Sequence, residues 1–489
     1  MLDYLKEETN KTYTENGAVT FATTMSDCLD LFATIGAVRN ASEEDIITGF
    51  TRAYAEDPVI ATKILFYARD IRGGLGERRV FKTILRYLAE HEPDTVIRNI
   101  VNVAEYGRYD DLLVLIGTPC EKYLIAYYKE TLEKDLDALD NKGEVSLLAK
   151  WLPSVNASNS ETVKCAKKLA RKMGYTDASY RKILSRLRSY IKIIENNLRT
   201  RDYSFEYEKQ TSKSLLKYRQ AFIKNDNERY EAFLEKAVSD PSVYNTGTLT
   251  PYDIVAPVVD RYERKKAFTK EERRSLDVTW NALENYVGCE NALAVVDGSG
   301  SMYCYGNPLP AAVAESLGIY FAERNTGAFK GHFITFSHKP KLVKIKGRDI
   351  VEKMNYCMGY NECSNTNIAA VFNLILSTAV KNNMTQNDIP DSLYIISDME
   401  FDWCAEDASV TNFENAKKSF EKHGYKLPRL VFWNVCSRNR QQPVTMNDEG
   451  VILVSGCTPQ IFSMITNDRI DPYQFMMSVI TSKRYERIA

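Results

Sequence analysis

One carboxylate and two hydroxyls occupy alternate positions in the segment Asp297-Gly298-Ser299-Gly300-Ser301, directly after the apolar run 292–296. Oxygen ligands of this kind suit Mg²⁺ or another hard divalent cation better than a soft metal. The two glycines let the backbone turn tightly, so that the three polar side chains can reach one point. The spacing therefore predicts a metal-binding loop at the end of a buried strand.

Two later segments supply further oxygen ligands. Thr366 precedes an apolar run with helical spacing, and Asp398 comes after Ser397 at the end of the expected buried strand 392–396. Because open α/β sheets build ligand sites at the carboxyl ends of their strands, we expect Asp398 to lie beside Asp297, with Thr366 joining them. The alternative is that these residues only cap helices and satisfy loop amides.

The elements that must position these side chains follow from the apolar pattern. From residue 289 onward, short apolar runs alternate with helical segments. We expect strands at 293–296, 332–336, 342–345, 393–396, 430–434 and 451–454. This alternation predicts a doubly wound, mostly parallel α/β sheet. The intervening helices are expected at 310–324, 368–381, 413–423 and 459–466, with a last one from 472.

The first half of the chain has a different pattern. From Ser42 to Asp240 the apolar residues recur at helical spacing, with only short breaks, which predicts an array of helical repeats. We therefore expect a helical-repeat region at 1–245, a bridging segment at 246–288 and the α/β domain at 289–489.

The five polar residues together form a recognisable set. Asp297, Ser299, Ser301, Thr366 and Asp398 resemble the metal-ion-dependent adhesion site (MIDAS) of von Willebrand factor A domains, whose pattern is DxSxS, a distant Thr and a distant Asp. The resemblance implies that the serines and Thr366 bind Mg²⁺ directly or through water, while the aspartates hold ordered waters. It also implies an open coordination position for a carboxylate from a protein partner.

Positive charge gathers in one segment of a chain whose formal net charge is −1. Between Lys164 and Arg201, twelve Lys and Arg residues face two acidic residues, and tyrosines are interleaved. A basic helical face with aromatics is typical of binding to a phosphate backbone, whereas the alternative is a solvated face paired with acidic groups elsewhere. The candidate RNA-binding residues are Lys164, Lys168, Arg171, Lys172, Arg181, Lys182, Arg186, Arg188 and Lys192.

A second group of basic residues surrounds the glycine-rich segment 73–76, which has arginines on both sides. Its backbone amides could hold an anion, and the alternative is an ordinary turn between two helices.

Five stretches carry a wider resemblance: YARDIRGGLGERRVF, YGRYDDLL, LAKWLPS, DGSGSM and ISDMEFD. They resemble a family of uncharacterised bacterial, phage and plant proteins that join a helical N-terminal region to a von Willebrand A-like domain. More distantly, the architecture resembles the Ro autoantigen family, in which a ring of HEAT-like helical repeats (the TROVE module) is closed by a von Willebrand A domain. That resemblance implies binding to single-stranded RNA ends or structured non-coding RNA.

Composition narrows the classes of function. The chain has four histidines, ten cysteines without a CxxC pair, no apolar run of the length that spans a membrane and no signal-peptide pattern, so we expect a cytoplasmic protein. The chain has no GxSxG elbow, no GxxxxGK[ST] loop and no HExxH helix. A hydrolase using Asp297 and Asp398 is disfavoured, because no base is evident.

We therefore expect a non-enzymatic RNA-binding protein with a Mg²⁺ site. The alternative is a metal-dependent protein–protein adaptor without a nucleic-acid role.

Overall fold

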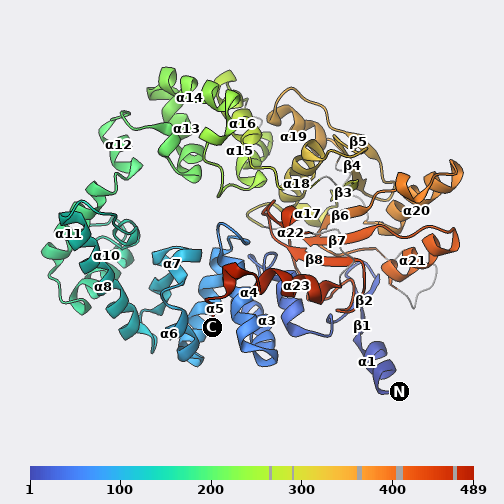
Figure 1. Cartoon of the computed structure of the whole chain (residues 1–489), viewed down its shortest axis with the longest axis horizontal. Helices are drawn as coiled ribbons and strands as arrows, with labels where there is room; N and C mark the ends of the chain where they lie inside the picture. The colour runs from blue at the N-terminus through green and yellow to red at the C-terminus, as the bar shows by residue number, and fades with distance from the viewer. Residues whose placement is uncertain (264–266, 289–290, 305, 361–365, 403–410, 466–470) are drawn as a thin grey trace.

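A computed structural model describes residues 1–489 except 264–266, 289–290, 305, 361–365, 403–410 and 466–470. Helices make up most of the first 280 residues, and a six-stranded, mostly parallel sheet with its helices makes up the rest (Figure 1). The prediction of a helical region followed by a mostly parallel sheet is confirmed at this level. No helix in the described ranges has the length and apolar character needed to cross a bilayer.

Within the described residues, the N-terminal part contains sixteen α-helices, three 3₁₀ helices and one short hairpin. The hairpin strands are β1 (Lys11–Tyr13) and β2 (Val19–Phe21). The helices are α1 (Leu2–Asn10), α2 (Asp27–Thr34), α3 (Glu43–Glu56), α4 (Pro58–Arg69), α5 (Arg78–His91), α6 (Pro93–Asn99), α7 (Val103–Tyr106), α8 (Glu121–Asp140), α9 (Leu148–Trp151), α10 (Ser160–Lys172), α11 (Asp177–Tyr190), α12 (Ile194–Thr200), α13 (Ser212–Asn225), α14 (Asn227–Ser239), α15 (Pro251–Glu263) and α16 (Lys270–Asn281).

The C-terminal part contains the sheet. Its strands are β3 (Ala292–Asp297), β4 (His332–Phe336), β5 (Leu342–Lys344), β6 (Ser392–Ser397), β7 (Arg429–Asn434) and β8 (Val451–Ser455). Its helices are α17 (Ser301–Cys304), α18 (Pro310–Arg324), α19 (Ile350–Met358), α20 (Ile368–Lys381), α21 (Asn412–Lys422), α22 (Ile461–Met464) and α23 (Pro472–Ile480). The hairpin, α17 and α19 were not predicted.

Local sequence signals explain where several helices begin. Ser42 accepts a hydrogen bond from the Asp45 amide at 3.0 Å and caps α3. Asp57 accepts bonds from the amides of Val59 and Ile60, both at 2.9 Å, directly before the proline that opens α4. These caps separate consecutive helices without long loops.

The strand order is β5-β4-β3-β6-β7-β8, and every neighbouring pair is parallel except β4 and β5. From β3 the chain moves outward to one edge, and from β6 it moves outward to the other. The carboxyl ends of β3 and β6 therefore flank the topological switch point, where open α/β sheets bind ligands.

Helices cover both faces of the sheet. Val296 and Ile396 pack on one face with α18, while Val295 and Ile395 pack on the other with α20 and α21. All six residues of β3 and all six of β6 are buried, because successive side chains alternate between two covered faces.

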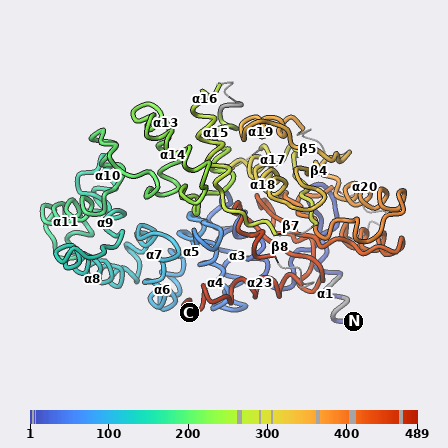
Figure 2. Tube along the Cα trace, turned by 45° about the horizontal axis from the view of Figure 1, so that its top comes forward, coloured from blue at the N-terminus to red at the C-terminus, as the bar shows by residue number. Residues whose placement is uncertain are grey.

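Both ends of the helical part contact the sheet part. At the first end α2 packs against β8, and at the other end α15 and α16 pack against α18 and α19. The helices between them follow an arc, so that the chain forms a closed circuit (Figures 1 and 2). The chain end completes the contact, since Tyr485 donates a hydrogen bond to Asp70 at 3.1 Å.

Candidate metal site and basic surface

The two carboxylates of the predicted metal site lie at adjacent strand ends. Asp297 is the last residue of β3, and Asp398 directly follows β6. The Ser397 hydroxyl donates to Asp297 Oδ2 at 2.5 Å across the two strands. Both aspartates are almost fully buried. Parallel pairing of β3 with β6 thus brings together residues one hundred positions apart.

The loop after β3 folds its hydroxyls towards each other. The Ser299 amide donates to Asp297 Oδ1 at 2.8 Å, and the Ser299 and Ser301 hydroxyl oxygens are 3.0 Å apart. Octahedral Mg²⁺ with bonds of about 2.1 Å places neighbouring ligand atoms about 3 Å apart. The spacing of these two hydroxyls therefore fits adjacent positions around such an ion.

Thr366 lies in the loop before α20 and contacts the loop after Asp398. Its hydroxyl donates to the Glu400 carbonyl at 2.7 Å, and its own carbonyl accepts from the Asp402 amide at 2.9 Å. Asn16 Nδ2, from the β1–β2 turn, lies 3.4 Å from the Thr366 hydroxyl. The structure thus joins Thr366 to the Asp398 loop, while its polar contacts in the described residues do not reach the serines.

Electrostatics favour a cation at this edge. Burial, followed by the proximity of Asp398, raises the pKa of Asp297 to about 7. Within the part of the chain that the structure describes, no three His, Cys, Asp or Glu side chains cluster to hold a metal. Any metal here would therefore depend on the hydroxyls of Ser299, Ser301 and Thr366 as well as on the two carboxylates.

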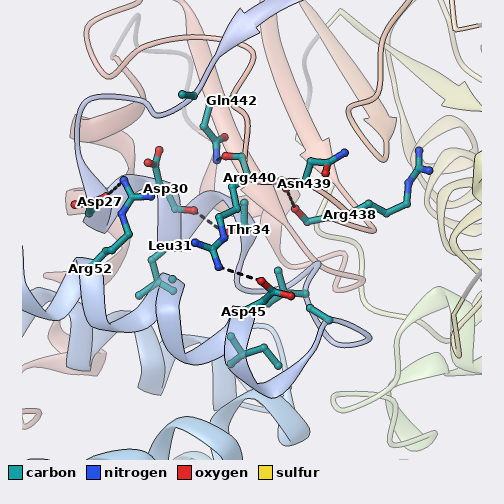
Figure 3. A pocket seen from close by; sticks show the side chains of 16 residues that line it. Asp27, Asp30, Leu31, Thr34, Asp45, Arg52, Arg438, Asn439, Arg440 and Gln442 are labelled. Carbon is teal, nitrogen blue, oxygen red and sulfur yellow. Dashed lines mark hydrogen bonds and ion pairs between the residues drawn. The ribbon is translucent and has the colours of Figure 1, made fainter. Parts of the chain in front are cut away.

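Sequence reasoning missed Arg438, which directly contacts the site. Its guanidinium lies 3.0 Å from Asp398 Oδ2 and 2.7 Å from Glu15 Oε2. Arg438 belongs to the loop after β7, which lines a pocket of about 240 Å³ together with α2 and α3. In Figure 3 its guanidinium points away from Asp27 and Arg52 on the other side of that pocket.

Ser337 is a second residue that sequence reasoning missed. It directly follows β4, the strand beside β3, and it is 3% exposed. Its hydroxyl has no hydrogen-bond partner among the described residues. Ser337 follows β4 and Arg438 follows β7, and both strands were predicted. Their positions after predicted strands could therefore have identified them as candidate site residues.

The basic segment forms an exposed surface on α10 and α11, which Lys192 extends just after the end of α11. Eight of the nine predicted residues are exposed: Lys164, Lys168, Arg171, Lys172, Arg181, Lys182, Arg186 and Lys192. Four of these eight are held by carboxylates of neighbouring residues, namely Lys164 by Glu161, Lys168 and Lys172 by Glu121, and Arg186 by Asp140. The other four, Arg171, Arg181, Lys182 and Lys192, have no carboxylate within ion-pair distance in the described ranges.

Contrary to our expectation, Arg188 does not face outward. It donates to the carbonyls of Ala149 at 2.8 Å and Leu152 at 2.6 Å and to the Ser154 hydroxyl at 2.6 Å. Burial lowers its pKa. Arg188 therefore stabilises the packing of α11 against the segment after α9. Of the interleaved tyrosines, Tyr180 is buried and Tyr190 is exposed.

The glycine-rich segment 73–76 is a turn between α4 and α5. The amides of Leu75 and Gly76 donate to the carbonyls of Tyr67 and Asp70 at 3.1 and 3.0 Å. Because these amides satisfy the end of α4, they do not form a cradle for an anion.

Two family models match the chain, and both describe domains of unknown function. DUF2828 matches residues 14–127 and 159–288, and DUF7788 matches residues 291–481. The chain is thus a two-part protein with a helical DUF2828 region followed by a sheet-containing DUF7788 region.

A relative covers nearly the whole chain. The Uncharacterized protein L728 of Acanthamoeba polyphaga mimivirus is 30% identical over 513 residues, which cover 96% of this chain and 87% of that protein. The chain belongs to the same family as L728. Among solved structures, it is similar to the crystal structure of the Deinococcus radiodurans RO (RSR) protein, with a TM-score of 0.39 and 14% identity over 93% of this chain and 92% of that one.

Proposed function

We propose that this protein is a non-enzymatic RNA-binding protein whose helical region holds RNA and whose sheet part binds Mg²⁺. The observation that carries the RNA proposal is the exposed surface of α10 and α11. Four cations there have no carboxylate within ion-pair distance in the described residues, so they are available to phosphate groups without first breaking an ion pair.

The sheet part supports the metal proposal and a von Willebrand A-like fold. The strand order places Asp297 and Asp398 at the switch point, and the Ser299 and Ser301 hydroxyls are spaced as neighbouring ligands of a hard cation. When bound, Mg²⁺ would supply a coordination position for an external oxygen ligand. The residues that would hold it are Asp297, Ser299, Ser301, Thr366 and Asp398.

The closed circuit supports a Ro-like arrangement of HEAT-like helical repeats and a terminal sheet. In this proposal the RNA contacts are Lys164, Lys168, Arg171, Lys172, Arg181, Lys182, Arg186 and Lys192, and Arg188 acts only by holding α11 in place.

Filter binding of single-stranded and structured RNA across a salt series tests the RNA proposal. The affinity is expected to fall steeply with salt, because binding releases counterions from the phosphate backbone. The variant Arg171→Ala/Arg181→Ala/Lys182→Ala should lose about tenfold or more in affinity and show a shallower salt slope.

The matched control is Lys417→Ala/Lys418→Ala/Lys422→Ala, which removes the same charge from exposed positions on α21. Equal loss in both variants, or RNA binding that does not weaken in high salt, would contradict a specific role for α10 and α11.

A metal-dependent protein–protein adaptor is the second candidate. One contact favours it: the carboxylate of Glu15, from a distant segment of the chain, binds Arg438, and Arg438 also binds Asp398. A partner's acidic side chain could approach the same edge of the sheet. Two results together would favour the adaptor. A protein partner would be recovered with the unmodified protein but not with Asp297→Ala, and neither protein would bind RNA.

A further inference from the structure

A cleft of about 590 Å³ opens where three distant stretches of the chain meet. One wall is the turn between α4 and α5, the second is the segment 247–253 that leads into α15, and the third is the segment 457–460 after β8. We call it the junction cleft. Its volume lies in the range of sites for small molecules, about 300–1,000 Å³. It shares no residue with the candidate metal site or with the basic surface of α10 and α11.

The junction cleft is positively charged. Six cations line it, namely Arg39, Arg69, Arg78, Arg79, Arg108 and Lys213, against the two acids Glu77 and Asp253. Even when Asp110 and Asp111 behind the arginines are counted, the cations exceed the carboxylates by two. Burial and the neighbouring Arg78 lower the pKa of Lys82, which lines an adjoining hollow that also contains Arg78 and Arg79.

Several of these arginines are held in place before any ligand arrives. Arg69 is bound to Asp111 at 2.6 Å, and Arg108 is bound to Asp110 at 2.9 Å. The Arg108 guanidinium also lies over the Trp151 ring, 3.9 Å from its centroid. Fixed side chains lose little conformational entropy on binding, which favours recognition of an anion.

Among the cations that line the junction cleft, Arg79 has the most hydrogen-bond donors available to a ligand. It is exposed at the start of α5, and its Nη1 donates to the carbonyls of Arg39 at 2.9 Å and Ala41 at 2.7 Å. These contacts hold the side chain, while no carboxylate in the described residues lies within ion-pair distance. The planar fork of a guanidinium matches two oxygens of one phosphate group.

Other residues that line the junction cleft offer different chemistry. Tyr252 presents a half-buried aromatic ring, and Thr250 and Gln460 add polar groups. Gln460 Oε1 is buried and has no hydrogen-bond partner among the described residues. An aromatic ring suits stacking of a base, and an unpaired carbonyl oxygen suits a hydroxyl or amino donor.

We propose that the junction cleft binds a free nucleotide, with its phosphates on Arg78 and Arg79 and its base against Tyr252. This site goes beyond the proposed function, because it requires neither the metal nor the surface of α10 and α11. Since its walls come from both parts of the chain, a bound nucleotide would tie the helical part to the sheet part.

Isothermal titration calorimetry of the full chain with inorganic phosphate, AMP, ADP and ATP, in EDTA, tests the proposal. Nucleotides should bind at least about tenfold more tightly than inorganic phosphate, because stacking adds to the phosphate contacts. Arg79→Ala should weaken nucleotide binding about tenfold or more, since it removes a charge-assisted contact. The matched control is Arg98→Ala on α6, an exposed arginine with no carboxylate within ion-pair distance in the described residues, which should leave nucleotide binding unchanged.

Thermal melting establishes that both variants fold, and Tyr252→Leu provides a second variant that should abolish the preference for nucleotides over phosphate. Three results would each overturn the proposal: no heat with any nucleotide at millimolar concentration, equal weakening in Arg79→Ala and Arg98→Ala, or binding of oligonucleotides alone. The last result would assign the cleft to a nucleic-acid surface. The variant Arg171→Ala/Arg181→Ala/Lys182→Ala distinguishes this site from the proposed function. If it loses RNA binding but keeps nucleotide binding, the junction cleft and the RNA-binding surface are separate sites.

Discussion

Arg438 and Asp398 form an ion pair at 3.0 Å across two loops that follow neighbouring parallel strands. The Asp398 carboxylate is almost fully buried, and Arg438 also binds Glu15 at 2.7 Å. A cation of the protein itself thus already neutralises one of the two carboxylates of the candidate metal site.

Replacing Arg438 should strengthen metal binding. In Arg438→Gln the repulsion between the guanidinium and an incoming dication disappears, so the affinity for Mg²⁺ or Mn²⁺ should rise severalfold, by about 1 kcal/mol. Titration calorimetry at neutral pH measures this change. The control is Arg440→Gln in the same loop, where the arginine pairs with the exposed Asp45 instead. Weaker metal binding in Arg438→Gln would mean that the arginine supports the site rather than competing with the metal.

The buried carboxyl of Glu315 predicts a pH-dependent stability. Glu315 on α18 is 2% exposed, its Oε1 has no hydrogen-bond partner in the described part of the chain, and burial raises its pKa to about 8. Between its unfolded pKa, about 4.3, and its folded pKa, the unfolded state has lost this proton while the folded state keeps it. The group therefore makes the protein less stable as pH rises through that window.

Glu315→Gln should remove this loss, because a neutral amide has no proton to release. Urea denaturation at pH 5 and pH 8 should show a gain in the free energy of unfolding that is larger at pH 8, of the order of a few kcal/mol. The exposed Glu421→Gln on α21 is the control and should show no such difference. An equal gain at both pH values would indicate a packing effect.

Arg188→Ala should destabilise the helical part, because it leaves two backbone carbonyls and a hydroxyl without their donor. The expected loss in the free energy of unfolding is about 2–4 kcal/mol. Chemical denaturation compares this variant with Arg181→Ala, which lies on the same helix but is exposed and should change stability by less than about 0.5 kcal/mol.

Gly36→Ala should weaken the contact between α2 and β8. A Cβ atom at Gly36 would lie 2.8 Å from the backbone of Ser455 and Gly456, and the Gly36 amide donates to the Ser455 hydroxyl at 3.0 Å. We expect a loss of about 1–3 kcal/mol and faster hydrogen exchange in both segments. Gly49→Ala within α3 meets no atom within 4 Å and should instead raise stability by up to about 1 kcal/mol.

The sequence was sufficient to predict the sheet because its strands are continuous apolar runs. Residues 293–296 and 393–396 are strands buried on both faces, as expected from their apolar runs, whereas the strand order that creates the switch point comes from the structure. By contrast, the strands of the β1–β2 hairpin have three residues each, which is too short for a periodic pattern. Its turn reaches the loop after Asp398 through contacts that no local signal encodes.

The basic surface shows a similar limit. The burial of Leu184 and Leu187 agrees with helical periodicity, but periodicity treats every charged residue of α11 as outward-facing. Arg188 instead donates hydrogen bonds to acceptors about 35 residues earlier in the chain. These bonds form only because α9 and α11 pack together, which the local sequence does not indicate. Ion pairs such as Lys172 with Glu121 likewise join residues that the sequence keeps apart.

Open arrays of helical repeats have two terminal faces, each of which needs a polar capping repeat to stay in water. In this chain α2 and α4 at one end, and α15 and α16 at the other, are covered by β8, α23, α18 and α19. The DUF7788 part therefore acts as the cap for both faces at once, so the DUF2828 part expressed without it should expose two apolar surfaces and aggregate.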